Sequence, residues 1–570
     1  MPIRNYNGEL RNFIPKLMGP ATEGYASLRP CYLKDGVPST YVVPGDWMKD
    51  IEKWDYPKTQ FPKSNENTVQ YFCATDGHNA GGLATYEAMR KAFDTAKGDG
   101  HFILLAGWSH DLSFALDGNP KARKGSLSTM AEIWAKKAKD KVKIRTLLWR
   151  PAWGSDVETT INPMAKTNAA LLDALGVKPD ENAFGNRGKL PPLAMGSSGQ
   201  NGKETEYINT LNVDGSTPRL ALGIWDGSLR DQVFPCHHQK ILIVYGQEGL
   251  YGFFGGVDIY ADRVIPDKDG APQHDVHCRV IGKAAMQLLQ LWIDRWNACR
   301  EARDQEDASH WLDAARAPGT VSPSGPGQPC QQVQIGQTVG NPSIKYPSDG
   351  FDMLSHCIQN TKKFIYMQDQ YFWSIDAVDE LRAVLSRIEH LTIVLPDPSI
   401  SSPLIAGTLL RRAAIAHLVE GLAPTDLKKV GIYCPSPAGD PGTYVHSKIW
   451  IFDDECAIVG SSNCNNRGYF SDSELMGRIS EGSMRTWDDL DLNFAHKLRL
   501  DLWSHHLRKP KEALYDPSSV AYFRLQEDPC RIKDHVDRFG HWTDQSKWDN
   551  DSFQNKMELF VAWAGADQRP

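Results

Sequence analysis

The sequence predicts an α/β protein built from two similar lobes, each a mixed β-sheet flanked by helices. Three observations support this prediction. The order helix, strand, helix, strand occurs twice, a segment rich in Pro, Gly and Ser separates the two copies, and each copy carries a His-x-Lys pair at the head of an apolar strand. The chain has 570 residues with 41% hydrophobic content, which can fill one large core or two fused ones.

The first copy is defined by its hydrophobic spacing. Apolar side chains share one helical face between Leu83 and Ala96, and the apolar run 102–106 follows as a buried strand. Residues 129–140 again have helical spacing, and residues 142–149 are rich in β-formers at nearly alternating positions. These segments predict two helices that alternate with two strands.

The second copy repeats this order. A helical pattern at 351–361 precedes the apolar strand 364–367, and a second helical pattern at 377–388 precedes the strand 391–395. The composition of residues 317–329 cannot form a packed element, so we expect a connection there. The predicted parts are an N-terminal extension at 1–65, a first lobe at 66–316, an inter-lobe connection at 317–345, and a second lobe with a C-terminal extension at 346–570.

A long motif in the second copy carries the clearest chemical signal. His446 and Lys448 lie two residues apart in a strand-like segment, so their side chains point to the same face. Asp453 and the segment 460–463, which ends at Asn463, complete the pattern H-x-K-x4-D-x6-G-S-x-N. A lone H-x-K arises by chance in a chain of this length, but the added residues at fixed offsets make this pattern specific.

The first copy carries a partial version of the motif. His238 and Lys240 again head an apolar strand, and a Gly-Gly-Val-Asp segment follows at 255–258. Tyr245 stands where the second copy has its aspartate. The matching order of helices and strands makes this second His-x-Lys pair credible.

These motifs resemble the phospholipase D superfamily, in which two H-x-K-x4-D motifs from two halves share one active site. The resemblance covers about residues 66 to 510 and looks closest to eukaryotic-type phospholipases D, although the N-terminal extension is too short for their usual lipid-binding domains. Further segments that look like the family's landmarks are 107–109, 254–258, 274–279, 365–371, 472–474 and 494–503.

Two histidines suit the cleavage of a phosphodiester, because a neutral imidazole can attack phosphorus while a protonated one donates to the leaving oxygen. Unperturbed imidazole titrates near pH ~6.5, so one ring can be neutral and the other charged around neutrality. The resemblance implies that His238 is the nucleophile and His446 the general acid and base. The expected catalytic residues are His238, Lys240, His446, Lys448, Asp453, Asn463, Asp275 and Glu474.

The resemblance also implies the roles of the two carboxylates, one for each ring, that would fix the tautomers. Asp275 is expected to orient His238, and Glu474 to orient His446, with Asp472 as an alternative partner for the latter. The two lysines and Asn463 would bind the non-bridging oxygens of the phosphate, so we expect no metal and no cofactor.

Three further residues are expected to line a headgroup pocket by resemblance, namely Trp108, Gln370 and Tyr371; packing at strand ends is the alternative. Asp258 stands where some relatives carry a phosphate-binding asparagine, and we do not assign it as a ligand. The tryptophans Trp47 and Trp54 offer a membrane-contacting rim, or ordinary core.

Composition limits the partners. There are 63 basic and 70 acidic residues, and a net charge of -7 argues against binding long nucleic acid. No signal-peptide pattern and no apolar stretch of transmembrane length is present, and the 11 cysteines form no C-x-x-C pair. We expect a monomer that is cytoplasmic or peripheral on a membrane, or exported without a signal peptide.

The predicted activity is hydrolysis of glycerophospholipids at a membrane surface, with water or an alcohol as the acceptor. One alternative is a nuclease or nucleic-acid phosphodiesterase of the same superfamily, and another is an inactive protein that binds lipid or a partner. A zinc site is a further alternative, because histidine and cysteine are the usual zinc ligands. Its ligands would come from Cys236, His237, His238, His274, His277 and Cys278.

Overall fold

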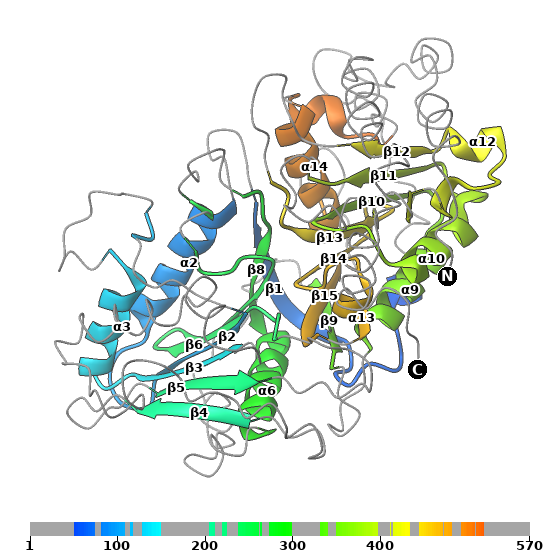
Figure 1. The fold of residues 1–570 in the computed structure, drawn as a ribbon. Coiled ribbons are helices and arrows are strands. Elements are labelled where there is room, and N and C mark those ends of the chain that lie inside the picture. The colour runs from blue at the N-terminus through cyan, green and yellow to red at the C-terminus, as the bar shows by residue number, and fades with distance from the viewer. Residues whose placement is uncertain are drawn as a thin grey trace, which may run out of the picture.

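The computed structural model describes much of the two predicted lobes (Figure 1). The described residues are 51–73, 81–108, 115–117, 128–149, 205–210, 219–224, 237–260, 263–264, 273–298, 331–339, 349–396, 411, 414–415, 417–433, 444–470, 472–481, 492–507 and 509–517.

The described strands form one continuous 15-stranded sheet. The first-lobe strands, from the middle of the sheet to its edge, are β1 (Ser64–Phe72), β8 (His277–Gly282), β7 (Gly249–Gly255), β6 (Ile241–Gly246), β2 (Phe102–Gly107), β3 (Lys143–Trp149), β5 (Arg219–Ile224) and β4 (Thr205–Thr210). The second-lobe strands, again from the middle outward, are β9 (Gln331–Thr338), β15 (Glu474–Glu481), β14 (Cys456–Gly460), β13 (Lys448–Phe452), β10 (Phe364–Asp369), β11 (His390–Val394) and β12 (Val430–Tyr433).

The order of the strands confirms the duplication. From β1 outward and from β9 outward, the first four pairings are antiparallel, and the next two pairings are parallel in both lobes. The two halves meet where β1 pairs antiparallel with β9. In Figure 1 these central strands lie between the first-lobe elements and the second-lobe elements. The predicted α/β class with two similar lobes is therefore confirmed.

Helices cover both faces of the sheet. The longer ones are α2 (Gly81–Thr95), α3 (Met130–Lys139), α6 (Lys283–Ala298), α9 (Gly350–Asn360), α10 (Ile375–Leu385) and α14 (Phe494–Leu507), and the short ones are α12 (Pro424–Leu427), α13 (Asn466–Phe470) and the 3-10 helix η4 (Lys511–Leu514). Alternate strand residues face opposite layers, so Ile243 packs in a core with α6 and α14, whereas Val244 packs with α2 and α3.

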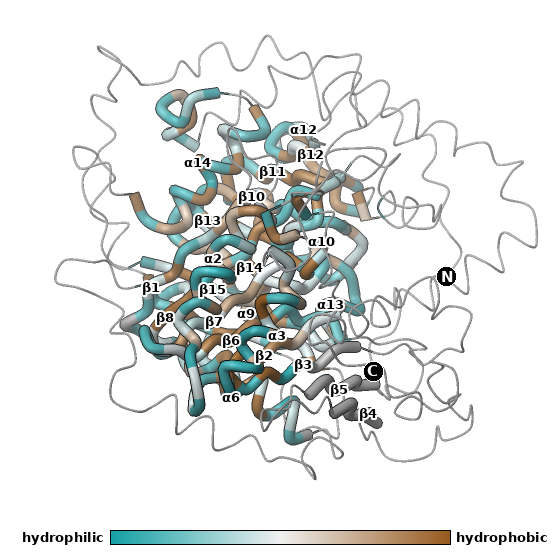
Figure 2. The backbone as a smooth tube through the Cα atoms, turned by 90° about the vertical axis from the view of Figure 1, so that its left-hand side faces the viewer, coloured by the Kyte–Doolittle hydropathy of each residue, from teal (hydrophilic) through white to brown (hydrophobic). Residues whose placement is uncertain are grey.

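The core under α6 and α14 contains strand residues of both lobes, whereas α2 and α3 cover a first-lobe core and α9 and α10 cover a mainly second-lobe core. Figure 2 shows hydrophobic residues gathered along the strands in the middle of the described chain. The two lobes thus share the core under α6 and α14 and are not independently packed. None of the described helices is both long and apolar enough to cross a lipid bilayer.

Two features differ from the predicted boundaries. The expected inter-lobe connection at 317–345 contains β9, which belongs to the second-lobe half of the sheet. The expected extension at 1–65 includes Trp54, whose side chain is fully buried in the second-lobe core and donates a hydrogen bond to Glu455 at 3.1 Å. Trp54 is therefore not part of an exposed membrane-contacting rim, and Trp47 lies outside the described residues.

The aspartate of the second motif has a structural position, which corrects its expected place among the catalytic residues. Asp453 follows β13 at the end opposite to Lys448. Its buried carboxylate accepts hydrogen bonds from the backbone N–H groups of Lys362, Lys363 and Phe364 at 2.8, 2.8 and 2.9 Å. It therefore supplies the acceptors for backbone N–H groups in and just after the connection between α9 and β10. That connection is only three residues long (361–363).

The first lobe does without this aspartate because its connection is longer. Six residues (96–101) join α2 to β2, and some of their backbone N–H groups find acceptors within the segment, for instance through a 2.9 Å hydrogen bond from the Lys97 N–H to Nδ1 of His101. Tyr245 instead packs its ring against Phe102, with 5.2 Å between ring centroids. The replacement of aspartate by tyrosine therefore follows the length of the connection.

We predict that Asp453→Ala lowers the free energy of unfolding by about 3 kcal/mol, because three backbone N–H groups, of which that of Phe364 is buried, lose their acceptor. Denaturant unfolding of the full-length chain measures this. Tyr245→Phe, at the equivalent position, keeps the ring contact and should be nearly neutral. Equal effects of the two substitutions would contradict this structural role.

Candidate active site

His446 is placed by a contact between the lobes. Val445 forms a parallel bridge with His274 of the first lobe, and the backbone N–H of His446 donates to the His274 carbonyl at 2.8 Å. This pairing brings Nδ1 of His446 to 2.7 Å from Oδ2 of Asp275, a carboxylate with no solvent exposure. Because Nδ1 donates its proton to the carboxylate, Nε2 is the nitrogen available for chemistry.

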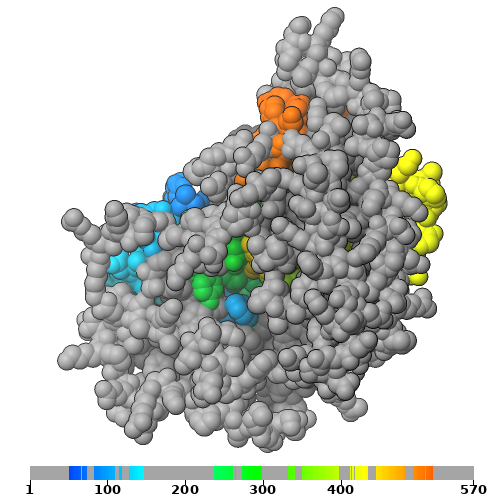
Figure 3. All heavy atoms as spheres, turned by 45° about the horizontal axis from the view of Figure 1, so that its top comes forward, coloured from blue at the N-terminus to red at the C-terminus, as the bar shows by residue number. Residues whose placement is uncertain are grey.

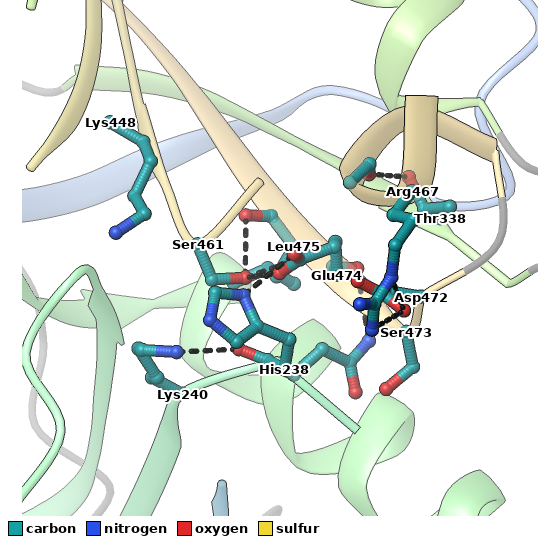
Figure 4. A network of polar contacts seen from close by, with 12 residues as sticks. His238, Lys240, Thr338, Lys448, Ser461, Arg467, Asp472, Ser473, Glu474 and Leu475 are labelled. Carbon is teal, nitrogen blue, oxygen red and sulfur yellow. Dashed lines mark hydrogen bonds and ion pairs between the residues drawn. The ribbon is translucent and has the colours of Figure 1, made fainter. Parts of the chain in front are cut away.

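His238 is placed in the same way by the second lobe. His237 forms a parallel bridge with Ser473, and the backbone N–H of His238 donates to the Ser473 carbonyl at 3.0 Å. Nδ1 of His238 then lies 2.7 Å from Oε1 of Glu474 (Figure 4). The second carboxylate oxygen of Glu474 accepts a 2.5 Å hydrogen bond from the Ser461 hydroxyl, which fixes its orientation.

The expected pairing of histidines and carboxylates is therefore wrong. We expected Asp275 beside His238 and Glu474 beside His446, and the structure shows the reverse. Each carboxylate orients the histidine of the other lobe, because the two parallel bridges cross between the lobes. The alternative partner, Asp472, forms an ion pair with an arginine of α13 at 3.0 Å.

The two motif lysines have matching conformations. The Lys240 ammonium donates to the carbonyl of His238 at 2.9 Å, and the Lys448 ammonium donates to the carbonyl of His446. Lys448 also lies 3.3 Å from the side-chain oxygen of Gln370. Both lysines are buried, and Figure 4 shows them reaching toward the same side of His238, Lys448 from β13 and Lys240 from the position before β6. Two buried ammonium groups beside the histidines form an environment suited to an anion.

The electrostatics favour neutral rings in the absence of an anion. Burial lowers the pKa of His238, and the positive charges of Lys240 and Lys448 lower it further. Burial also lowers the pKa of His446, followed by the charge of Lys448. Both shifts have the same direction, which differs from the expected division into one neutral and one charged ring. An anionic group bound beside the lysines would raise both pKa values and return a proton to one ring.

Arg263 is a residue of the site that the sequence did not reveal. Its guanidinium lies 3.5 Å from both ring nitrogens of His446 and 3.6 Å from the carboxylate of Asp275. The carboxylate of Asp258 lies 3.4 Å from the Lys240 ammonium and 3.7 Å from Arg263. A single arginine five residues after Asp258 has no pattern that distinguishes it from a surface arginine, so no sequence signal identified it.

Asn463 occupies the position in the second lobe that Asp258 occupies beside Lys240 in the first lobe. In the two equivalent turns, Asp258 follows β7 and Asn463 follows β14 at the same offset. Asn463 is buried, and its side-chain oxygen has no hydrogen-bond partner among the described residues. Asp369 accepts hydrogen bonds from the N–H of the next residue, Cys464, at 3.2 Å, which holds this turn against the end of β10.

One glycine is required by the geometry of the site. A side-chain Cβ at Gly256 would lie 2.0 Å from Oδ1 of Asp275, so any larger residue there would displace the carboxylate that orients His446. The equivalent residue of the second lobe is Ser461, whose hydroxyl binds the equivalent carboxylate. The Gly-Gly and Gly-Ser segments of the motifs therefore support the two carboxylates.

The structure places one of the three expected headgroup residues, Gln370, beside Lys448, and Tyr371 is the next residue along the chain. Gln370 contacts that lysine and donates to the hydroxyl of Tyr444 at 2.6 Å, and Tyr371 stacks on Trp373 with 4.0 Å between ring centroids. Trp108 follows β2 as Gln370 follows β10, so it occupies the equivalent position of the first lobe. The expected headgroup role of these residues remains a prediction.

The alternative zinc cluster does not form among the residues that the structure describes. His237 contacts the Ser473 hydroxyl at 3.0 Å, Nδ1 of His277 accepts from the backbone N–H of Val257 at 3.3 Å, and Cys278 packs in the shared core. Cys236 lies outside the described residues. These side chains therefore have separate environments.

Comparison with known proteins supports the same family. Residues 354–496 match a family described as "Cardiolipin synthase, PLD-like domain". Phospholipase D alpha 2 and phospholipase D alpha 1 of Arabidopsis thaliana are 25% and 23% identical, over 75% and 77% of this chain and 64% and 66% of their own lengths. These matches support membership of the phospholipase D superfamily.

The chain spans slightly less than two thirds of the length of these plant phospholipases D. Among solved structures, a phosphatidylserine synthase of Haemophilus influenzae Rd KW20 matches with a TM-score of 0.46 and 11% identity, covering 87% of this chain and 95% of that one.

We predict that the crossed pairing is visible in the side-chain nitrogen resonances of 15N-histidine-labelled protein. Asp275→Asn should shift the ring resonances of His446 and leave those of His238 nearly unchanged, because only His446 donates to Asp275. Glu474→Gln should do the opposite. A large shift of His238 in Asp275→Asn would contradict the structure.

We also predict a pH dependence of anion binding. Burial lowers the pKa of Lys448 to about 8, so this lysine loses its positive charge as the pH rises through that value. Affinity for sulfate, which keeps its charge, should fall about tenfold between about pH 7 and about pH 9. Isothermal titration calorimetry measures this, and Lys448→Met should bind weakly at both values. A constant affinity in the wild-type protein would refute the assignment.

Proposed function

We propose that this protein is a phospholipase D that hydrolyses glycerophospholipids to phosphatidic acid and a free headgroup. The observation that carries the proposal is the pair of crossed histidine–carboxylate contacts with two buried lysines beside them. This arrangement supplies two oriented imidazoles and a positive environment for one phosphodiester anion.

The first step is attack by one imidazole on phosphorus. Nε2 of His238 forms the P–N bond while the bond from phosphorus to the headgroup oxygen breaks, and Nε2–H of His446 protonates that oxygen. The order of the two histidines rests on the resemblance to the family. Lys240, Lys448 and Asn463 bind the non-bridging oxygens. The negative charge of these oxygens would raise the pKa of His446, so that this ring carries the proton that it donates.

The second step releases phosphatidic acid. His446 accepts a proton from water, whose oxygen attacks phosphorus while the P–N bond to His238 breaks. An alcohol that enters the same position reacts equally, so transfer to alcohols should accompany hydrolysis. Asp275 and Glu474 keep both rings in the required tautomer throughout the cycle.

A lipid substrate agrees better with this chain than nucleic acid does. The net charge is -7, which disfavours the binding of a long polyanion, and the plant relatives are named phospholipases D. Gln370, which contacts Lys448, would contact the headgroup together with Tyr371 and Trp108. The protein would then act as a monomer at a membrane surface from the cytoplasmic side, or after export without a signal peptide.

The test is a lipid assay with vesicles of phosphatidylcholine, phosphatidylethanolamine or phosphatidylglycerol in the presence of ethanol. We expect phosphatidic acid together with phosphatidylethanol, identified by mass spectrometry, because both acceptors capture the same intermediate. Cleavage of DNA without action on any of these lipids would contradict the proposal and favour a nuclease.

Alanine substitutions test the division of labour. His238→Ala and His446→Ala should each lower turnover by about 10²-fold or more, since each removes a proton-transfer group or the nucleophile. His417→Ala is the matched control, because that ring contacts Asp379 at the surface and not the site. Full activity of His238→Ala would show that the first motif is structural.

A further inference from the structure

Three histidines converge behind the active site. His274 precedes β8 in the first lobe, and His505 and His506 lie in the last turn of α14 in the second lobe. Each offers a ring nitrogen, and these three nitrogens lie within 4.8 Å of one another. The ring of His274 lies 5.2 and 5.0 Å, centroid to centroid, from those of His505 and His506.

Two of these rings present nitrogens that are buried without a hydrogen bond. Nε2 of His274 and Nδ1 of His506 have no partner among the described residues, and His274 has no solvent exposure. Buried polar atoms are normally satisfied, so an unpartnered nitrogen in a cluster of imidazoles calls for a missing partner. His505 and His506 are partly exposed, so an ion can reach them from solvent. Figure 3 shows part of the orange C-terminal region of the described chain at the surface.

We propose that His274, His505 and His506 bind one divalent transition-metal ion of the Zn²⁺ class. Three imidazoles are typical ligands of such an ion, and water would complete a tetrahedral shell. In a tetrahedral site the ligand nitrogens are about 3.3 Å apart, so nitrogens that now lie within 4.8 Å of one another must approach by at most about 1.5 Å. Rotation of the partly exposed His505 and His506 side chains supplies this movement.

Gln368 controls the protons on two of the rings. Its side-chain N–H donates to Nδ1 of His274 at 2.8 Å, and its oxygen lies 2.8 Å from Nε2 of His506. In this orientation His506 offers a lone pair at Nδ1, whereas His274 carries its proton on Nε2. A metal-bound histidine usually donates its second N–H to a carbonyl or carboxylate, so Gln368 in this orientation supports His506 as a ligand. His274 binds through Nε2 only after its proton has left that nitrogen and its hydrogen bond from Gln368 is lost.

A bound ion would connect the two lobes behind His446. The His274 carbonyl accepts the backbone N–H groups of His446 and Ser447 at 2.8 and 3.2 Å, and Asp275 is the next residue. Gln368 also donates to the Ser447 hydroxyl at 2.5 Å. Fixing the His274 ring to α14 therefore holds the segment that orients the catalytic ring. The role of the ion is positional, and the ion takes no part in the steps proposed above.

The experiment uses full-length protein without a histidine tag, stripped with a chelator and titrated with ZnCl2. We expect one Zn²⁺ per chain and a higher melting temperature when zinc is bound. His505→Ala and His506→Ala should each weaken binding by at least about tenfold, whereas His417→Ala should not change it. Gln368→Glu should tighten binding about tenfold, because a carboxylate accepts protons from both His274 and His506.

Cobalt provides an independent measurement. Protein loaded with Co²⁺ should show the visible absorption of a tetrahedral ion, and the double variant His505→Ala/His506→Ala should lack it. Absence of stoichiometric zinc binding in the wild-type protein, or zinc binding that survives the double variant, would overturn the proposal. Both readouts measure occupancy, so they are independent of whether the protein cleaves lipids.

Discussion

The crossed contacts between histidines and carboxylates are the constraint on which the rest of the site depends. Asp275 and Glu474 are fully or almost fully buried, and a buried carboxylate is costly unless it is paired. In each case the paired histidine comes from the other lobe, His446 or His238. A lobe on its own would keep its carboxylate and lose this partner. The continuous sheet and the shared core under α6 and α14 therefore serve to keep two backbone bridges in register.

The two copies have kept the same topology while their supporting residues diverged. The carboxylate of the first lobe lies against Gly256, whereas that of the second is bound by the hydroxyl of Ser461. Asp258 contacts a motif lysine, whereas the equivalent Asn463 keeps an unpartnered amide oxygen. These differences give chemically unequal environments to two histidines whose backbone positions are equivalent, as a division into nucleophile and acid requires.

Most of the correct predictions came from patterns between residues close together in the sequence. The order of helices and strands follows from hydrophobic spacing, and His446 and Lys448 were found because a two-residue offset places side chains on one face. The partner of Asp275 could not be predicted, because it depends on which backbone segments bridge the lobes. Asp453 was misplaced because a linear motif does not distinguish the two ends of a strand. Arg263 lies in no motif, and only the fold brings it to the site.

Double-mutant cycles on the free energy of unfolding test the crossed pairing most directly, because they measure coupling between chosen pairs without a substrate. Each cycle combines His446→Ala or His238→Ala with Asp275→Asn or Glu474→Gln. The structure predicts coupling of about 1 kcal/mol or more for His446 with Asp275 and for His238 with Glu474, and nearly additive effects, within about 0.5 kcal/mol, for the two opposite combinations. The reverse result, with coupling inside each lobe, would contradict the account.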